Sequence, residues 1–339
     1  MAAGTPLTMK DMAALAGVSE STISRALADH PSIAAKTRAR IKALSIQQGY
    51  FVNPVARSLR SRQTRTIAVV IPLFHEAAQH MSDPFFSLIL GHLADGASSR
   101  GYDLLLSKVL DHDQEWVSRA VDQRRADAVI VVGQSLAHEM IEAAAQRGAP
   151  VVAWGAKTEG QSYVTVGSNN RMGGDLATAH LLQTGRRRLA FLGDRRLPEV
   201  AQRFEGFVEA HRRYGLTWDE YLVIESHFEP EQAYRDTQAL VRRARDIDGV
   251  VAVSDLIAVS MIRVLAEEGR STPGDVGVVG FDDTPMAAHT NPSLTTIRQD
   301  VQHGADLLVE LALKLASGVP ATAVELPVEL IIRGSSVPI

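Results

Sequence analysis

Residues 8–27 read TMKDMAALAGVSESTISRAL and predict two short helices joined by a tight turn. We expect Thr8 to cap a helix over residues 9–16, because its hydroxyl can accept a backbone N–H of the first turn. Gly17 allows a turn through a backbone conformation that strains residues with a Cβ. Ser19 is expected to cap a second helix that extends to about residue 28.

A third helix is predicted from about residue 35 to residue 48, with Gly49 as its stop. The apolar residues of these segments are expected to pack the helices together. Residues 8–49 therefore predict a small all-helical unit. Its expected core comprises Ala13, Leu15, Val18, Ile23 and Leu27 in the first two helices, with Ile41, Leu44 and Ile46 in the third.

Charge is distributed unevenly along the 339 residues. Residues 1–66 contain ten Lys and Arg against three Asp and Glu, whereas the rest of the chain contains 25 basic and 36 acidic residues. A basic unit on an acidic body indicates a polyanion, such as nucleic acid, as the partner of that unit alone. The alternative is that these basic side chains are ordinary solvated helix faces.

The segment after the helical unit reads NPVARSL at residues 53–59. Asn followed by Pro favours a helix start, yet two turns without a core face are too short to be stable alone. We therefore expect a helix that forms only under some conditions. The polar stretch 60–66 follows as a linker, so we place three domains at 1–52, 53–66 and 67–339.

From residue 67 onward, short apolar strands alternate with segments of helical length. This alternation is typical of parallel sheets covered by helices on both sides, and about 270 residues exceed one such sheet. We expect two similar lobes, one from about 67–167 and 295–320, the other from about 168–294 and 321–339. Ligands of such folds bind at the carboxyl ends of the strands, here in the cleft between lobes. The expected strands are Ile67–Ile71, Leu104–Ser107, Ala128–Val132, Val151–Trp154, Leu189–Leu192, Leu222–Ile224, Val250–Val253 and Val276–Gly280.

Several patches, in chain order, resemble the lactose-repressor (LacI/GalR) family. They are the stretch 8–27, the segment 53–59, GFDD at 280–283, LTTIRQ at 294–299 and LIIRGS at 330–335. The resemblance covers nearly the whole chain. It implies an all-α helix-turn-helix DNA-binding domain and an α/β two-lobed sensor of the periplasmic-binding-protein kind. It also implies a transcription regulator that binds a palindromic operator as a homodimer.

The resemblance implies base-reading side chains on the second helix, namely Glu20, Ser21 and Arg25, of which Arg25 can pair with guanine. In the segment 53–59, paired hinge helices would enter the minor groove and insert Leu59 between base pairs. Asn53 would start this hinge helix, and Val55 and Ala56 would form the contact between the paired hinges. Many relatives carry a hydroxyl residue where this chain has Ala34. Phosphate contacts are implied for Thr8, Ser19, Thr22, Ser24, Lys36, Thr37 and Arg38.

Positions that bind an effector in the family follow the strands of the predicted sensor. Carboxylates, an arginine and aromatic rings suit a sugar, whose hydroxyls they can bind and whose faces they can stack upon; a purine would accept the same stacking. Ser254 replaces a common Asn, Asn169 stands where Asp is frequent, and Trp154 lies either in the cleft or in the core. The implied positions are Asp83, Phe85, Phe86, Trp154, Asn169, Arg203, Phe228, Ser254, Asp255, Asp282 and Gln299.

Other classes of protein fit the sequence less well. No GxGxxG or GxxxxGK[ST] pattern supports nucleotide chemistry, and Asp282 and Asp283 would point to opposite sides of a strand, so we expect neither an enzyme nor a cofactor. His75 and His80 lack a metal-ligand spacing, and the chain contains no cysteine. The alternative is a sugar-binding protein without a DNA role, which would carry a signal peptide that the N-terminus lacks. We expect a cytoplasmic repressor with no membrane span.

Overall fold

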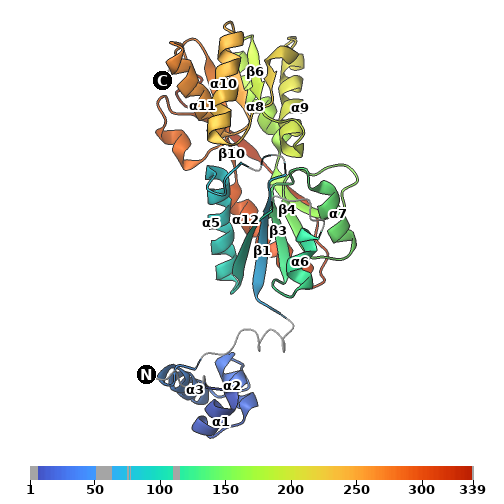
Figure 1. Cartoon of the computed structure of the whole chain (residues 1–339), viewed down its shortest axis with the longest axis vertical. Coiled ribbons are helices and arrows are strands. Elements are labelled where there is room, and N and C mark those ends of the chain that lie inside the picture. Colours follow the sequence, from blue (N-terminus) through green and yellow to red (C-terminus); the bar gives the residue numbers. More distant parts are fainter. Residues whose placement is uncertain (1–6, 51–62, 75, 77, 110–114, 338–339) are drawn as a thin grey trace. The chain divides into compact units, whose positions relative to one another are not determined.

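The computed structural model of the chain describes residues 7–50, 63–74, 76, 78–109 and 115–337. The chain divides into two compact units, Met1–Thr64 and Arg65–Ile339 (Figure 1). The first unit is helical, and the second consists of two α/β lobes. None of the helices among these described residues is long and apolar enough to cross a membrane.

The first unit contains α1 (Met9–Ala16), α2 (Glu20–Leu27) and α3 (Ala35–Gln47). Thr8 caps α1 in a capping box, in which its hydroxyl accepts the N–H of Asp11 and its own N–H donates to the Asp11 carboxylate. Gly17 follows with φ 66°, a left-handed conformation suited to a residue without a Cβ. Ser19 caps α2 through the N–H of Thr22. The predicted caps are thus present and set the angle between the two helices.

The core of this unit excludes Leu15 and Ile46, which were expected in it, and also contains Met12, Ala16, Ala26 and Tyr50, which were not. Met12, Ile23 and Ile41 are fully buried, whereas the side chains of Leu15 and Ile46 are 53% and 79% exposed. Met12 and Ala16 stand four residues apart on the inner face of α1, which turns Leu15 outward. We expected Leu15 and Ile46 in the core because they are apolar, without considering which face of the helix carries them, and that expectation was wrong.

Two six-stranded sheets form the second unit, and each makes one lobe. The first sheet has the strand order β11-β5-β4-β3-β1-β2 and the second has the order β12-β10-β9-β8-β6-β7. Every pairing is parallel except that of β10 with β12. The strands are β1 (Thr66–Pro72), β2 (Asp103–Val109), β3 (Ala128–Val132), β4 (Val151–Trp154), β5 (Val164–Ser168), β6 (Leu189–Leu192), β7 (Val223–Ile224), β8 (Gly249–Ala252), β9 (Gly277–Asp282), β10 (Thr295–Gln299), β11 (Val324–Leu326) and β12 (Val328–Ile331).

Alternate residues of β1 show how the first lobe is layered. Ile67, Val69 and Ile71 pack with α5 (Pro84–Ser99) and α12 (Val301–Ala316) in one apolar cluster. Ala68 and Val70 pack with α6 (Trp116–Asp122) and α7 (His138–Gln146) in another. Because both faces of the sheet are covered, this strand is apolar throughout rather than alternating. Figure 1 shows α5 and α12 on one side of the sheet and α6 and α7 on the other.

The second lobe has one continuous core under α8 (Asn170–Gln183), α9 (Pro198–Arg213), α10 (Pro230–Arg243) and α11 (Asp255–Glu267). Helices α8 and α9 approach closely because glycines lie at their crossing. A Cβ on Gly174 would lie 1.9 Å from the carbonyl oxygen of Arg203, and one on Gly206 would lie 2.0 Å from that of Arg171. The crossing therefore fixes the helix that carries Arg203.

The chain changes lobes at different points from those expected. Strand β10, which we assigned to the first lobe, pairs with β9 and β12 in the second sheet, and β11 pairs with β5 in the first. Of residues 295–320, which we assigned to the first lobe, α12 is the element that packs there as expected. The misplacement has a physical cause: Thr295 and Thr296 are polar but buried in the second lobe, where Ser335, Ser336 and Asp255 provide hydrogen-bond partners.

Candidate DNA-reading helix and effector cleft

Helix α2 presents a polar outer face and an apolar inner face. Ile23 and Ala26 are fully buried, whereas Glu20, Ser21 and Arg25 are exposed. The last three side chains lie at helical positions 1, 2 and 6 and are accessible to a partner. This is the geometry of a helix that can enter a major groove with its N-terminal half toward the base edges.

The residues expected to contact phosphates surround this helix, but some already have structural roles. Thr8 and Ser19 are helix caps, and the Ser19 hydroxyl lies 2.9 Å from that of Thr22. Arg38 donates to the carbonyl oxygens of Asp29 and His30, which closes the turn after α2. Ala34 precedes α3 without a side-chain cap. Lys36 is exposed, Ser24 and Thr37 are half-buried, and the hinge positions Asn53, Val55, Ala56 and Leu59 lie outside the described residues.

A cavity of about 810 Å³, counted to its open mouth, lies between the two lobes at the carboxyl ends of their strands. Nine of the residues implied by the resemblance line this cavity: Asp83, Phe85, Phe86, Trp154, Arg203, Phe228, Ser254, Asp282 and Gln299.

Arg203 is the best-anchored polar group of the cavity. Its Nε donates to Asn170 Oδ1 at 2.8 Å, and Nη1 donates to the carbonyl oxygen of Val253 at 2.5 Å. The guanidinium also lies 3.6 Å from the centroid of the Phe281 ring. Burial lowers the pKa of Arg203, while the charges of Asp282 and Glu199 oppose that change. The side chain is therefore held in one orientation before any ligand arrives.

Asp282 lies at the end of β9 with φ 114°, a strained backbone conformation for a non-glycine residue. Gln299 of β10 donates to its carboxylate at 2.7 Å. Burial raises the pKa of Asp282 well above its ordinary value, the charge of Asp255 adds to that rise, and Arg203 opposes it. Strain and an unfavourable charge at one residue, facing a cavity, are typical of a binding position.

Two implied positions do not line the cavity. Asn169 caps α8 through the N–H of Met172 and donates to Glu325, so its side chain serves the helix end. Asp255 lies behind the wall, where it accepts hydrogen bonds from Thr284 and Thr296. Burial raises the pKa of Asp255 to about 6 in spite of those hydrogen bonds. Both residues support the site from outside it.

The cavity also contains polar residues that sequence reasoning missed, chiefly Gln79 and Glu199. Gln79 is buried and donates to Asp83, while its Oε1 has no hydrogen-bond partner among the described residues. Glu199 lies in the first turn of α9, one helical turn before Arg203. That spacing, which puts both side chains on one helix face, was the signal available for Glu199. The loop that carries Gln79 offers no such signal.

The aromatic side chains gather mainly on the first lobe. The rings of Phe85 and Trp154 lie 6.1 Å apart, and Phe86 lies 6.1 Å from Phe85. Trp154 packs over α12 at Gly304, where a Cβ would lie 2.2 Å from the indole ring. Trp154 is thus both part of the core and part of the cavity wall. Phe228 contributes an aromatic ring from the second lobe.

A helix with an exposed polar face and a two-lobed domain with a cavity between its lobes fit the class of ligand-responsive DNA-binding regulators. Residues 8–53 match the family described as bacterial regulatory proteins, lacI family, and residues 178–336 match the periplasmic binding protein-like domain. The transcriptional regulator CelR of Thermobifida fusca is 30% identical over 338 residues, which cover 97% of this chain and 98% of CelR. MalR of Streptomyces coelicolor is 31% identical over 343 residues, 97% of this chain and 96% of MalR.

Solved structures agree with this assignment. The structure of a CelR–cellobiose complex matches with a TM-score of 0.72 and 28% identity, covering 97% of this chain and 99% of the other. The lac repressor dimer bound to operator and the anti-inducer ONPF has the same fold, with a TM-score of 0.82 and 24% identity over 98% and 99% of the two chains. The chain belongs to the lacI family of bacterial regulatory proteins. It is a DNA-binding transcription regulator and not an enzyme, as the sequence predicted.

Proposed function

We propose that the protein is a cytoplasmic repressor that binds a palindromic operator as a homodimer and is released from it by a sugar. The observation that carries this proposal is the cavity between the lobes, lined by hydrogen-bond acceptors and aromatic rings, on a chain whose DNA-reading helix is exposed. The structure of the similar regulator CelR in complex with the sugar cellobiose supports this proposal.

The polar lining favours a sugar over a purine. Three carboxylates, those of Asp83, Glu199 and Asp282, line the cavity together with the unpartnered Oε1 of Gln79. Arg203 already donates two hydrogen bonds to protein groups, and Gln299 donates one. A ligand that supplies many hydroxyl donors satisfies such a set, and Phe85, Trp154 and Phe228 offer apolar surfaces for ring faces. A purine supplies fewer donors than a sugar to these acceptors.

For DNA, we assign direct readout to α2. Arg25 would pair bidentately with a guanine, and Glu20 would accept from a cytosine amine. Lys36 and the hydroxyls of Thr8, Ser19, Thr22, Ser24 and Thr37 would contact phosphates and set the register. Residues 53–66 would form the hinge, with Leu59 as the wedge in the minor groove. Effector binding would then change the spacing of the two hinges and their ability to fold on DNA.

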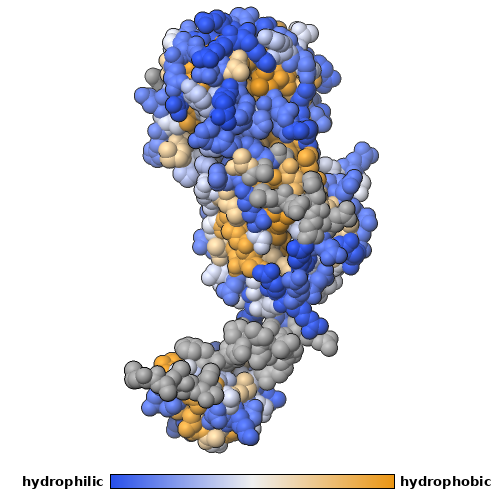
Figure 2. All heavy atoms as spheres, in the orientation of Figure 1, coloured by the Kyte–Doolittle hydropathy of each residue, from blue (hydrophilic) through white to orange (hydrophobic). Residues whose placement is uncertain are grey.

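For the dimer, we assign the contact surface to α5 and β2. Strand β2 lies at the edge of the first sheet, and the side chain of Leu106 on it is 46% exposed. Leu88, Leu90 and Leu104 are half-buried beside it. Figure 2 displays apolar side chains gathered on this part of the first lobe. An exposed apolar edge strand is a liability unless a partner covers it, and a second copy would do so.

Selection of duplexes from a random library by the full-length protein, at fixed salt, tests the proposed function. The expected result is enrichment of a palindrome with a flexible pyrimidine–purine step at its centre, where the Leu59 wedge would act. The selected duplex then serves to screen cellobiose, maltose and ribose for release. Absence of any enriched sequence, both with and without these sugars, would contradict the proposal.

A further inference from the structure

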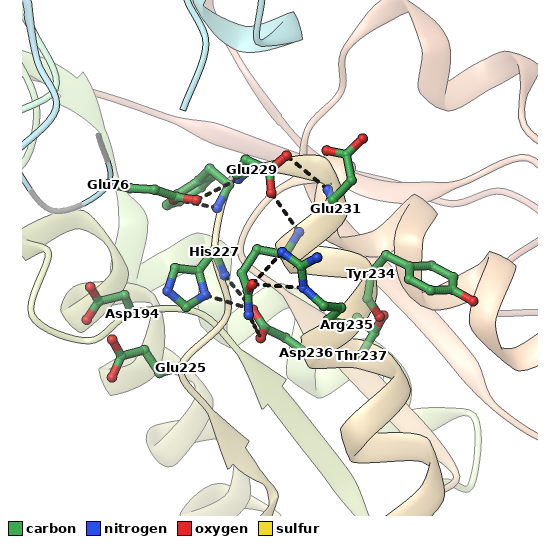
Figure 3. A network of polar contacts seen from close by, with 12 residues as sticks. Glu76, Asp194, Glu225, His227, Glu229, Glu231, Tyr234, Arg235, Asp236 and Thr237 are labelled. Carbon is green, nitrogen blue, oxygen red and sulfur yellow. Dashed lines mark hydrogen bonds and ion pairs between the residues drawn. The ribbon is translucent and has the colours of Figure 1, made fainter. Parts of the chain in front are cut away.

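A carboxylate of the first lobe joins the two lobes through hydrogen bonds to the backbone of the second. Glu76 lies between β1 and α5, and its side chain is 8% exposed. It accepts hydrogen bonds from two consecutive backbone N–H groups of the second lobe, those of Phe228 at 2.8 Å and Glu229 at 2.9 Å. Figure 3 shows this carboxylate facing the chain just ahead of α10. We name this contact the Glu76 bridge.

The Glu76 bridge completes the capping of α10. The carboxylate of Glu229 accepts the N–H groups of Glu231 and Gln232 in the first turn of that helix. Glu76 accepts the N–H groups of Phe228 and Glu229, which come just before the helix. A residue of the first lobe therefore helps to cap the N-terminus of a helix of the second lobe. The positive end of the helix dipole favours a carboxylate at this place. Phe228 lines the cavity whereas Glu76 does not, so Glu76 can position the wall without touching a ligand.

A second carboxylate joins the lobes in the opposite direction. Glu199, in the first turn of α9, belongs to the second lobe and accepts the N–H of Gln134 of the first lobe at 3.4 Å. The backbone N–H of Ala156, in the loop after β4, also favours the ionised form of Glu199 and so lowers its pKa, against the rise that burial causes. Gln202, one turn further along α9, donates to the carbonyl oxygen of Lys157 at 3.1 Å. We name these contacts the Glu199 bridge.

We propose that the Glu76 and Glu199 bridges hold the cleft closed as one cooperative unit. Each lobe gives one carboxylate and receives the other, and each carboxylate accepts at least one backbone N–H of the opposite lobe. Each lobe is well packed internally, so the two lobes move apart as rigid bodies. Breaking the hydrogen bonds of one bridge therefore weakens those of the other bridge. Glu76 is therefore a positioning residue for the effector site. Its consequence for effector affinity rests on the proposed function, but the closure itself does not.

Hydrogen exchange of the full-length, ligand-free protein tests the closure. In Glu76→Gln, one of the two acceptors becomes an NH₂ group that faces an N–H donor. We expect the amides of Phe228 and Glu229 to exchange about tenfold faster than in the wild type. The amides of Gln134 and Ala156, on the Glu199 side, are expected to accelerate as well. Glu205→Gln, an exposed substitution on α9, is the matched control and is expected to change neither set.

The reciprocal variant Glu199→Gln keeps the test valid if Glu76→Gln fails to fold, and it is expected to accelerate exchange at Phe228 and Glu229. Unchanged exchange at both sites would overturn the bridges. Acceleration confined to the side that was mutated would overturn the cooperative closure. A protein that selects no DNA sequence would contradict the proposed function but would leave this exchange result unaffected.

Discussion

The side chain of Gln299 donates a 2.7 Å hydrogen bond to the carboxylate of Asp282 at the floor of the cavity. The two residues end neighbouring parallel strands, β10 and β9, so the pairing of these strands sets their separation. Asp282 bears a strained backbone and a buried charge at the same place. Natural proteins retain such costs mainly where a ligand requires them.

Replacing Asp282 by Asn is expected to stabilise the fold and weaken effector binding. Burial raises the pKa of Asp282 well above its ordinary value, so ionisation of this carboxyl costs folding free energy that an amide at the same place does not cost. The free energy of unfolding of Asp282→Asn should exceed that of the wild type by about 1–2 kcal/mol. The gain should fade as pH falls, because the wild-type carboxyl then takes up its proton. Denaturant unfolding at two pH values measures this difference.

Replacing the Asp282 carboxyl by an amide should also lower sugar affinity about 10- to 100-fold, since the amide pairs less well with the sugar hydroxyls than the carboxyl does. Calorimetric titration with a sugar that releases the wild type from DNA measures this effect. Equal affinities for both proteins would show that Asp282 does not contact the effector.

Gly206→Ala is expected to destabilise the second lobe by at least about 3 kcal/mol, because its Cβ would collide with the backbone of α8. Gly91→Ala in α5 is the control, since no described atom lies within 4 Å of its added Cβ. That control should be neutral or stabilising. Thermal unfolding at one protein concentration compares the two variants, and similar melting temperatures would argue against the close crossing of α8 and α9.

Arg25→Ala and Lys36→Ala should weaken DNA binding in different ways. Loss of Arg25 is expected to relax specificity at one base pair of each half-site, by about 1–3 kcal/mol. Loss of Lys36 should weaken binding uniformly across sequences. It should also reduce the slope of log affinity against log salt concentration by about one, the value for one phosphate contact. Fluorescence anisotropy with single-base operator variants, at several salt concentrations, separates these effects. A uniform loss for Arg25→Ala would remove it from base readout.

Leu106→Glu is expected to convert the homodimer to a monomer, because it places a charge in the proposed apolar contact of β2. Sedimentation velocity gives the oligomeric state, and operator affinity should fall with it. Leu136→Glu is a control with the same exposure, 46%, in the loop before α7. If both variants stay dimeric, the contact surface lies elsewhere.

Sequence reasoning succeeded where local chemistry determines structure. The caps at Thr8 and Ser19 and the turn at Gly17 were predicted because each follows from one side chain and its own helix. Strands such as β1 and β3 were recognised because both of their faces are buried and apolar. The strand β10 escaped notice, since Thr295 and Thr296 are buried polar residues whose partners come from distant segments.

Part of the candidate effector site was also predictable, because the end of a strand fixes where the next side chains lie. Side chains that follow strands, such as Asp83 and Asp282, must lie at the sheet edge, and the cavity is there. Asn169 was misplaced because the sequence does not distinguish a helix cap from a ligand contact. Glu76 could not have been found, because its partners are backbone N–H groups 152 and 153 residues away. A backbone N–H can donate whatever side chain its residue carries, so the sequence gives no sign of such a contact.

The central claim is that occupation of the cleft is coupled to operator binding. The most direct test measures operator affinity with and without a saturating releasing sugar, and sugar affinity with and without operator. The account predicts that both affinities fall by the same factor, about 5- to 150-fold, because thermodynamic coupling is reciprocal. An operator affinity that stays constant while the sugar demonstrably binds would contradict it.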